Sequence, residues 1–174
     1  MIITIETNDK KVDTDKAYKV LEVEKHRLYY FKYKTEYDYI LNENGILVAI
    51  CYNESKTVQH NTGSSKKSPK CKNCGSWKNH WIKIAGKWPR YCSCETCTQE
   101  NNEVNIFFEE IIKETNTSFK GIADRGAHVI HVLSKNDTRV FIVPVCESDN
   151  PSNDSKVTIA AGTWFVRADQ SICR

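Results

Sequence analysis

The chain of 174 residues has little of what marks fibrous or low-complexity proteins, with only 7 glycines and 4 prolines. Hydrophobic residues make up 40% of it and charged residues 27%, so the sequence predicts a folded core in one domain or two small ones. No apolar run approaches the about 20 residues that cross a bilayer, and the first residues lack the basic and apolar regions of a secretion signal. We therefore expect a cytoplasmic protein without a membrane partner.

Acidic residues are missing from one long segment of the chain. Residues 56–93 carry nine Lys and Arg and no Asp or Glu, whereas residues 1–55 have a net charge of −2 and residues 94–174 a net charge of −4. Cations neutralise phosphates and exposed rings stack on unpaired bases, so a basic segment with aromatic residues predicts nucleic-acid binding. The predicted contact residues are Lys66, Lys67, Lys70, Lys72, Trp77, Lys78, Trp81, Lys83, Lys87 and Arg90.

The same segment allows two other interpretations. Trp77, Trp81 and Ile84 follow one another at helical spacing, which is also typical of a helix face packed into a core. The lysines would then form an ordinary solvated face, or would attract an acidic protein partner. All three interpretations remain open at the level of the sequence.

Eight cysteines are the most informative residues of the chain. In a reducing compartment, closely spaced cysteines favour metal binding over disulfides. Cys71 and Cys74 form a C-x-x-C-G knuckle, and Cys92, Cys94 and Cys97 form a second group after 17 intervening residues. Two such groups predict structural zinc, with one or two ions. The predicted ligands are Cys71, Cys74, Cys92, Cys94, Cys97, His128 and Cys146.

Four further residues were weighed as ligands. His80 lies near the first knuckle, and Asp149 follows the last predicted ligand. His80 could equally face a phosphate or solvent. Cys51 falls within an expected strand and Cys173 has no neighbouring ligand in the sequence, so both are expected to be ordinary cysteines.

The stretch GAHVIHVL, followed by VFIVPVC and ESDN, resembles HNH-type zinc proteins of the ββα-metal, treble-clef class over residues 71–151. The resemblance makes His128 the motif histidine, Cys146 the first knuckle cysteine and Asn150 the residue after the knuckle. It also implies that a motif histidine can activate water against a phosphodiester next to a divalent metal.

Two departures weaken the nuclease interpretation. Asp149 stands where the resemblance implies a second knuckle cysteine, and no histidine follows His131. We therefore expect a non-catalytic binding protein stabilised by zinc, which contacts nucleic acid. An interaction module or inhibitor, of phage or mobile-element origin, is the alternative, and an HNH-like metal-dependent nuclease is the second alternative.

The order of expected elements predicts an α+β fold in two parts. Residues 1–55 are expected to form a small antiparallel sheet, which resembles an SH3-like barrel, and residues 56–70 a basic flexible linker. Residues 71–174 are expected to form a treble-clef or HNH-like zinc domain with a helix over Asn102–Thr115. The strands are expected at Tyr18–Val23, Leu28–Lys34, Tyr37–Leu41, Ile46–Tyr52, Ala127–Leu133, Arg139–Val145, Val157–Ala160 and Thr163–Ala168. Three turns, at residues 42–45, 134–138 and 161–162, are expected to join neighbouring strands into hairpins.

Overall fold

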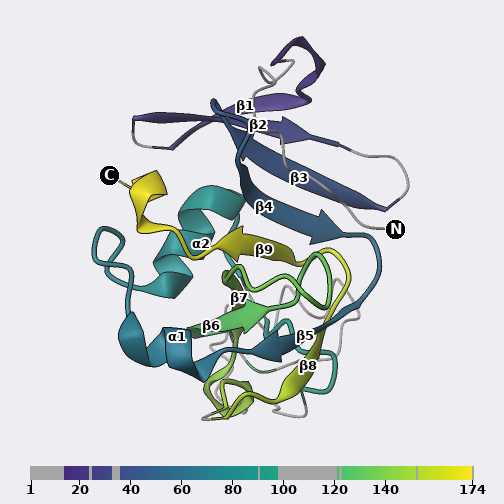
Figure 1. Ribbon diagram of the computed structural model, residues 1–174, viewed down its shortest axis with the longest axis vertical. Coiled ribbons are helices and arrows are strands. Elements are labelled where there is room, and N and C mark those ends of the chain that lie inside the picture. The colour runs from purple at the N-terminus through teal and green to yellow at the C-terminus, as the bar shows by residue number, and fades with distance from the viewer. Residues whose placement is uncertain are drawn as a thin grey trace, which may run out of the picture.

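Runs of β-branched and aromatic residues form nine strands, which pair in one antiparallel sheet. The computed structural model describes residues 14–23, 25–32, 36–89, 91–97, 121, 123–151 and 153–173. The strands are β1 (Lys19–Val23), β2 (His26–Phe31), β3 (Tyr37–Asn42), β4 (Leu47–Tyr52), β5 (Lys56–His60), β6 (Arg125–Ile130), β7 (Phe141–Val145), β8 (Lys156–Ile159) and β9 (Trp164–Arg167). Figure 1 shows them side by side along the long axis of the molecule, with β1 at one end and β8 at the other.

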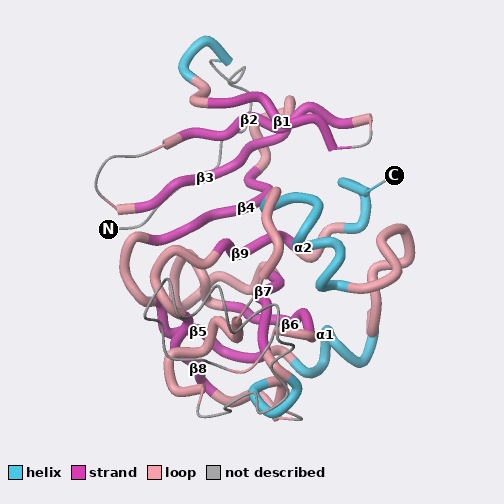
Figure 2. Tube along the Cα trace, turned by 180° about the vertical axis from the view of Figure 1, so that it is seen from behind, coloured by secondary structure: helices cyan, strands magenta, loops and turns pink. Residues whose placement is uncertain are grey.

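The strands are not ordered in space as they are along the chain. Their order in the sheet is β1-β2-β3-β4-β9-β7-β6-β5-β8, so the late strand β9 lies between β4 and β7. Its backbone pairs with both neighbours, through Phe165 with Ile50 of β4 and through Val166 with Ile142 of β7. Figure 2 shows the same order from behind. Because β9 joins the two halves, the sheet is continuous from end to end.

Successive residues of a strand point to opposite faces, and both faces of this sheet are buried. In β7, Phe141, Val143 and Val145 belong to one apolar core, while Ile142 belongs to the other. The helix α2 (Trp77–Ala85) covers the second face by packing on β6, β7 and β9. Each face therefore has its own core, and the cysteines are divided between the two.

The helix α2 has clear ends. Ser76 caps its start, because the Ser76 hydroxyl accepts a hydrogen bond from the backbone N–H of Asn79 at 3.0 Å, and Gly86 ends it in a left-handed conformation with φ of 66°. The apolar face holds Trp77, Trp81 and Ile84, all buried. The expected helical spacing is thus confirmed.

The expected fold class is wrong. Instead of an α+β fold, with a small β module before a treble-clef or HNH-like domain, one nine-stranded antiparallel sheet dominates the molecule. The described residues hold two α-helices, α2 and the short α1 (Thr62–Lys67). The segment 56–70, expected to be a linker, contains β5 and α1. Its polar composition conceals the strand, in which Val58 and His60 alternate with more exposed neighbours.

Most expected strands exist, but one expected pairing does not. The hairpins of β3 with β4 and of β6 with β7 are confirmed. The hairpin expected around Gly162 is wrong, since β8 pairs with β5 while β9 pairs with β4 and β7. The helix expected at Asn102–Thr115 lies outside the described residues. Within the described part of the chain, no helix has the length and apolar character needed to cross a membrane.

Candidate metal centres and the basic surface

Four buried side chains meet beside α2, three of them from one stretch of ten residues and the fourth from far along the chain. We call Cys71, Cys74, His80 and Cys173 the Cys3His cluster. The two knuckle cysteines precede α2, His80 lies within α2, and Cys173 ends the short 3-10 helix Gln170–Cys173. Gly75, with φ of 79°, allows the backbone to turn from the knuckle into the helix. Cys74 and Cys173 are 99 positions apart in the sequence.

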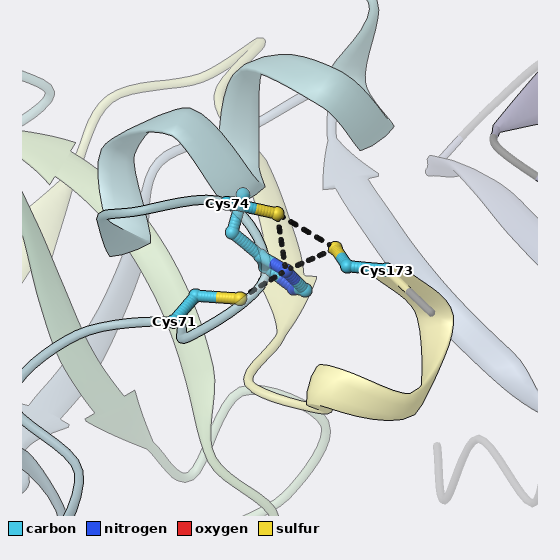
Figure 3. Close-up of side chains that lie close together, drawn as sticks. Cys71, Cys74 and Cys173 are labelled. Atoms are coloured by element: carbon cyan, nitrogen blue, oxygen red, sulfur yellow. Dashed lines mark hydrogen bonds between the residues drawn. The ribbon is translucent and has the colours of Figure 1, made fainter.

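The ligand atoms of the Cys3His cluster all lie within 4.8 Å of one another. The Nδ1 atom of His80 is 3.7 Å from the sulfur of Cys71, 3.9 Å from that of Cys74 and 3.0 Å from that of Cys173. The sulfurs of Cys74 and Cys173 are 2.9 Å apart. Figure 3 shows the three labelled cysteines pointing toward a common centre. One small ion between these atoms would touch all four.

The other ring nitrogen of His80 fixes how the imidazole is oriented. Nε2 lies 2.8 Å from the backbone carbonyl oxygen of Arg167, at the end of β9. If Nε2–H donates to this oxygen, the lone pair of Nδ1 points at the three sulfurs. Metal-binding histidines commonly have such a partner on their second nitrogen. Burial also lowers the pKa of His80, which favours the neutral ring that a metal requires.

Burial opposes thiolates in this cluster when no cation is present. It raises the pKa of the Cys74 thiol and, together with the neighbouring Cys74, that of Cys173. Ionisation of both Cys74 and Cys173 is therefore disfavoured unless a positive charge lies beside them. A divalent ion supplies that charge, so metal binding and thiol deprotonation are coupled here.

A second group lies on the opposite face of the sheet. We call Cys92, Cys97, Cys146 and Asp149 the Cys3Asp cluster. Cys146 directly follows β7, and Asp149 lies in the 3-10 helix Glu147–Asp149 after it. Cys92 and Cys97 come from the loop that follows α2. The end of one central strand thus supplies half of the cluster.

Short contacts hold the Cys3Asp cluster together. The Oδ2 atom of Asp149 is 3.1 Å from the sulfur of Cys92 and 3.2 Å from that of Cys146, and the sulfurs of Cys97 and Cys146 are 3.6 Å apart. Burial would raise the pKa of Asp149, but the thiols that donate to its carboxylate lower it below its ordinary value. The carboxylate is therefore ionised and available as an oxygen ligand.

Five of the seven predicted ligands lie in the two clusters, and the other two, Cys94 and His128, lie outside them. Among the predicted ligands, Cys71 and Cys74 fall in the Cys3His cluster, and Cys92, Cys97 and Cys146 fall in the Cys3Asp cluster. The structure adds His80, Cys173 and Asp149 to them. For His80 the signal was present, because the helical spacing places it on the buried face with Trp77 and Trp81. No local motif points to Cys173.

Cys94 and His128, the other predicted ligands, lie outside both clusters. Cys94 is buried, and its backbone forms an isolated bridge with Ile159. The Nδ1 atom of His128 lies 3.0 Å from the Ser64 hydroxyl, and its ring meets that of Trp77 edge-on at 5.0 Å between centroids. Cys51, expected to be an ordinary cysteine, is buried in the core next to α2 and belongs to neither cluster.

The predicted nucleic-acid residues divide into exposed and buried members. Trp77 and Trp81 are each only 4% exposed, and their indole N–H groups donate to the carbonyl oxygens of Ser68 and Trp164 at 2.6 Å. These two rings are therefore unavailable for stacking. The exposed lysines are Lys66, Lys67, Lys70, Lys72, Lys83 and Lys87, while Lys78 is half-buried. Arg90 lies outside the described residues.

One aromatic ring of the basic segment is exposed. Trp88 has 68% of its surface accessible, and the Lys78 ammonium lies 5.2 Å from the centre of its ring. The described residues thus contain two groups that could hold a metal ion, and they expose lysines beside an accessible indole. Comparisons with models of protein families, with curated proteins and with solved structures found no match.

Proposed function

We propose that the protein binds two structural zinc ions, one in each cluster, and contacts nucleic acid through the exposed lysines and Trp88 of residues 62–89. The observation that carries the metal proposal is the orientation of His80. Its Nε2 lies 2.8 Å from a backbone carbonyl, and its Nδ1 lies within 4 Å of three sulfurs. Three thiolates and one imidazole form a donor set that binds zinc in preference to harder divalent ions.

The size of the Cys3His cluster fits zinc. With Zn–S near 2.3 Å and Zn–N near 2.0–2.1 Å, the edges of a tetrahedral site are about 3.5 to 3.8 Å. The separations of His80 from Cys71 and Cys74, 3.7 and 3.9 Å, are close to these edges. The distances from the Cys173 sulfur to the Cys74 sulfur and to Nδ1 of His80, 2.9 and 3.0 Å, would lengthen slightly around the ion. A closed site without a free position favours a structural role.

The metal proposal is tested by counting ions in protein purified without chelators. Native mass spectrometry of the wild-type protein should show two zinc ions per chain. Asp149→Asn should lower the count to one or weaken the second ion, while Glu147→Gln, a neighbouring change outside the cluster, should leave two. Protein without zinc, or with disulfides among these cysteines, would contradict the proposal.

The nucleic-acid proposal depends on charge and exposure. The basic segment has no acidic residue between 56 and 93, so its lysines produce a positive local potential on a nearly neutral molecule. Trp88 beside Lys78 offers an exposed ring next to a positive charge, the combination on which proteins stack the bases of single-stranded nucleic acids. Because His128 belongs to neither metal cluster within the described residues, we do not extend the proposal to an HNH-like nuclease.

Fluorescence anisotropy with single- and double-stranded DNA and RNA tests this contact. Replacing Lys67, Lys70 and Lys72 by Gln should weaken binding to every sequence alike. It should also make the plot of log affinity against log salt concentration less steep. Each lost phosphate contact reduces the slope by about 0.7 to 0.9, and up to about three contacts are lost. The matched control replaces the exposed lysines of other surfaces, Lys19, Lys135 and Lys156, and should change little. Absence of binding at low salt would leave an acidic protein as the partner instead.

A further inference from the structure

A small cavity lies beside α1, at the end of β5 and next to β6. We call it the two-histidine pocket, because buried imidazoles from both strands line it. Its volume is about 180 Å³. The lining residues are His60, Asn61, Thr62, Ser65, Lys66, His128, Asn150 and Pro151. None of the metal ligands proposed above is among them, although Asn150 directly follows Asp149.

The chemistry of the wall is that of hydrogen-bond donors. No Asp or Glu lines the pocket, and Lys66 adds a positive charge. The side-chain oxygen of Asn61 already accepts from the backbone N–H of Ser64 at 2.9 Å, so the Asn61 amide NH2 is the end left to donate. The hydroxyl of Ser65 and the amide of Asn150 can donate as well. A ligand with several acceptor oxygens would match this set.

His128 provides the second, independent observation. Its side chain is only 3% exposed, and its Nε2 atom is buried without a hydrogen-bond partner among the described residues. The Ser64 hydroxyl, 3.0 Å from Nδ1, can donate to that atom, which assigns the ring proton to Nε2. An unpaired buried N–H carries a free-energy cost that a bound acceptor removes. The ring thus presents one further donor at the pocket.

The carboxylates nearest to the pocket are already engaged. Asp154 accepts hydrogen bonds at 2.8 Å from both the backbone N–H and the hydroxyl of Thr62. Asp149 accepts from the thiols of the Cys3Asp cluster. Asp154 is thus held by Thr62, a residue of the pocket wall, and its charge acts on Lys66 and His60. Neither carboxylate lines the cavity, and Lys66 is the charged side chain of the lining.

From this arrangement we infer that the two-histidine pocket binds a phosphate group. A phosphate has enough acceptor oxygens to pair with Lys66, His128 and the amide and hydroxyl donors at once. A cavity of roughly 150 Å³ accepts a benzene-sized molecule, so this pocket has room for the phosphate and part of an attached sugar. The inference rests on the proposed nucleic-acid function only for the source of the phosphate, which is a strand or a small phosphate ester.

The test follows the histidine rings of the zinc-loaded protein by nuclear magnetic resonance while inorganic phosphate is added at constant ionic strength. The ring signals of His60 and His128 should move with a saturable dependence, while those of His26 and His131, which lie elsewhere, should not. Lys66→Gln should weaken phosphate binding about three- to tenfold. Lys67→Gln, an equally charged exposed neighbour that does not line the pocket, should change it by less than about twofold.

A second arm adds an oligonucleotide in place of phosphate. If the rings of His60 and His128 move in both arms, the pocket takes a phosphate of the strand. If they move with inorganic phosphate alone, the pocket serves a small phosphate ester, and the inference stands even though the strand lies elsewhere. If neither ligand moves them, or if Lys66→Gln and Lys67→Gln behave alike toward phosphate, the inference is wrong. The separate lysine test of nucleic-acid binding is unaffected by that result.

Discussion

A Cβ atom on Gly126 would lie only 2.8 Å from the backbone carbonyl carbon of Trp77. The helix α2 therefore rests directly on the backbone of β6, at the residue where the helix begins. This contact positions the Cys3His cluster, since His80 lies one turn further along the same helix. A side chain at Gly126 would lift the helix and the cluster together.

We expect Gly126→Ala to lower the free energy of unfolding by about 1 to 3 kcal/mol, because the added methyl meets backbone that cannot move aside. Gly63→Ala is the matched control. Its Cβ would lie 3.5 Å from the side-chain oxygen of Asn61, an ordinary contact, and alanine is the better helix former. Thermal unfolding of the zinc-loaded proteins would show the difference, and equal melting temperatures would contradict the close approach.

The two cysteines expected to be ordinary should behave differently. Cys173→Ser removes a ligand from the Cys3His cluster and should release zinc and destabilise the fold. Cys51→Ser affects a buried thiol whose pKa burial raises to about 11, and it should keep both ions at a modest cost in stability. Zinc content measured by native mass spectrometry separates these outcomes. If both variants contain the same amount of zinc, Cys173 is not a zinc ligand.

Tryptophan substitutions separate the core from the proposed binding surface. Trp88→Ala should lose about 1 to 3 kcal/mol of single-strand affinity at an unchanged melting temperature, because an exposed ring contributes stacking but little packing. Trp81→Ala should cost about 3 to 5 kcal/mol of stability, because that ring is buried. Paired measurements of melting temperature and anisotropy test both. A stable Trp88 variant with undiminished affinity would exclude its stacking role.

Acid should destabilise the protein partly through His128. Burial lowers the pKa of this ring to about 4, whereas the unfolded chain has the ordinary value near 6.5. Below about pH 6.5 His128 takes up a proton in the unfolded state but not in the folded state, so the free energy of unfolding falls as the pH drops. Between pH 7 and 5.5 this amounts to about 1 kcal/mol.

Urea unfolding at these two pH values would measure the effect. His128→Gln should lose about 1 kcal/mol less than the wild-type protein over the same interval. Acid also weakens zinc binding, but it does so in both proteins, so the difference between them isolates the ring. An identical pH dependence in the two would show that His128 titrates normally in the folded state.

The strands could be predicted from the sequence because each one depends on a local pattern of residues. Alternating β-branched and aromatic residues identified eight of the nine strands, and the Asn44-Gly45 turn identified the β3–β4 hairpin. The order of the strands in the sheet could not be predicted from the sequence. Nothing near Trp164–Arg167 indicates that this strand inserts between β4 and β7, since strand pairing depends on contacts far apart in the sequence.

The candidate metal ligands divide in the same way. The spacing of Cys71 and Cys74, three positions apart, is by itself typical of a metal-binding knuckle. Cys173 enters the Cys3His cluster only because β9 and the following 3-10 helix carry it back to α2. The prediction of His128 as a ligand placed it with Cys146, but it lies outside both clusters, because a histidine within a strand has the same local pattern whether it faces a cluster or a pocket.

The central position of β9 has a consequence for how the protein is made. A ribosome delivers the chain from its N-terminus at about 5 to 20 residues per second, so Cys173 follows Cys74, 99 positions earlier, by roughly 5 to 20 seconds. Within that interval β7 is synthesised before β9, so β4 and β7 lack the strand that joins them until β9 follows, and the knuckle thiols lack Cys173 until its end. The ligands of the Cys3Asp cluster are all synthesised before then. The order of translation therefore sets the order in which the two side-chain clusters can be completed, and β9 completes the described sheet last.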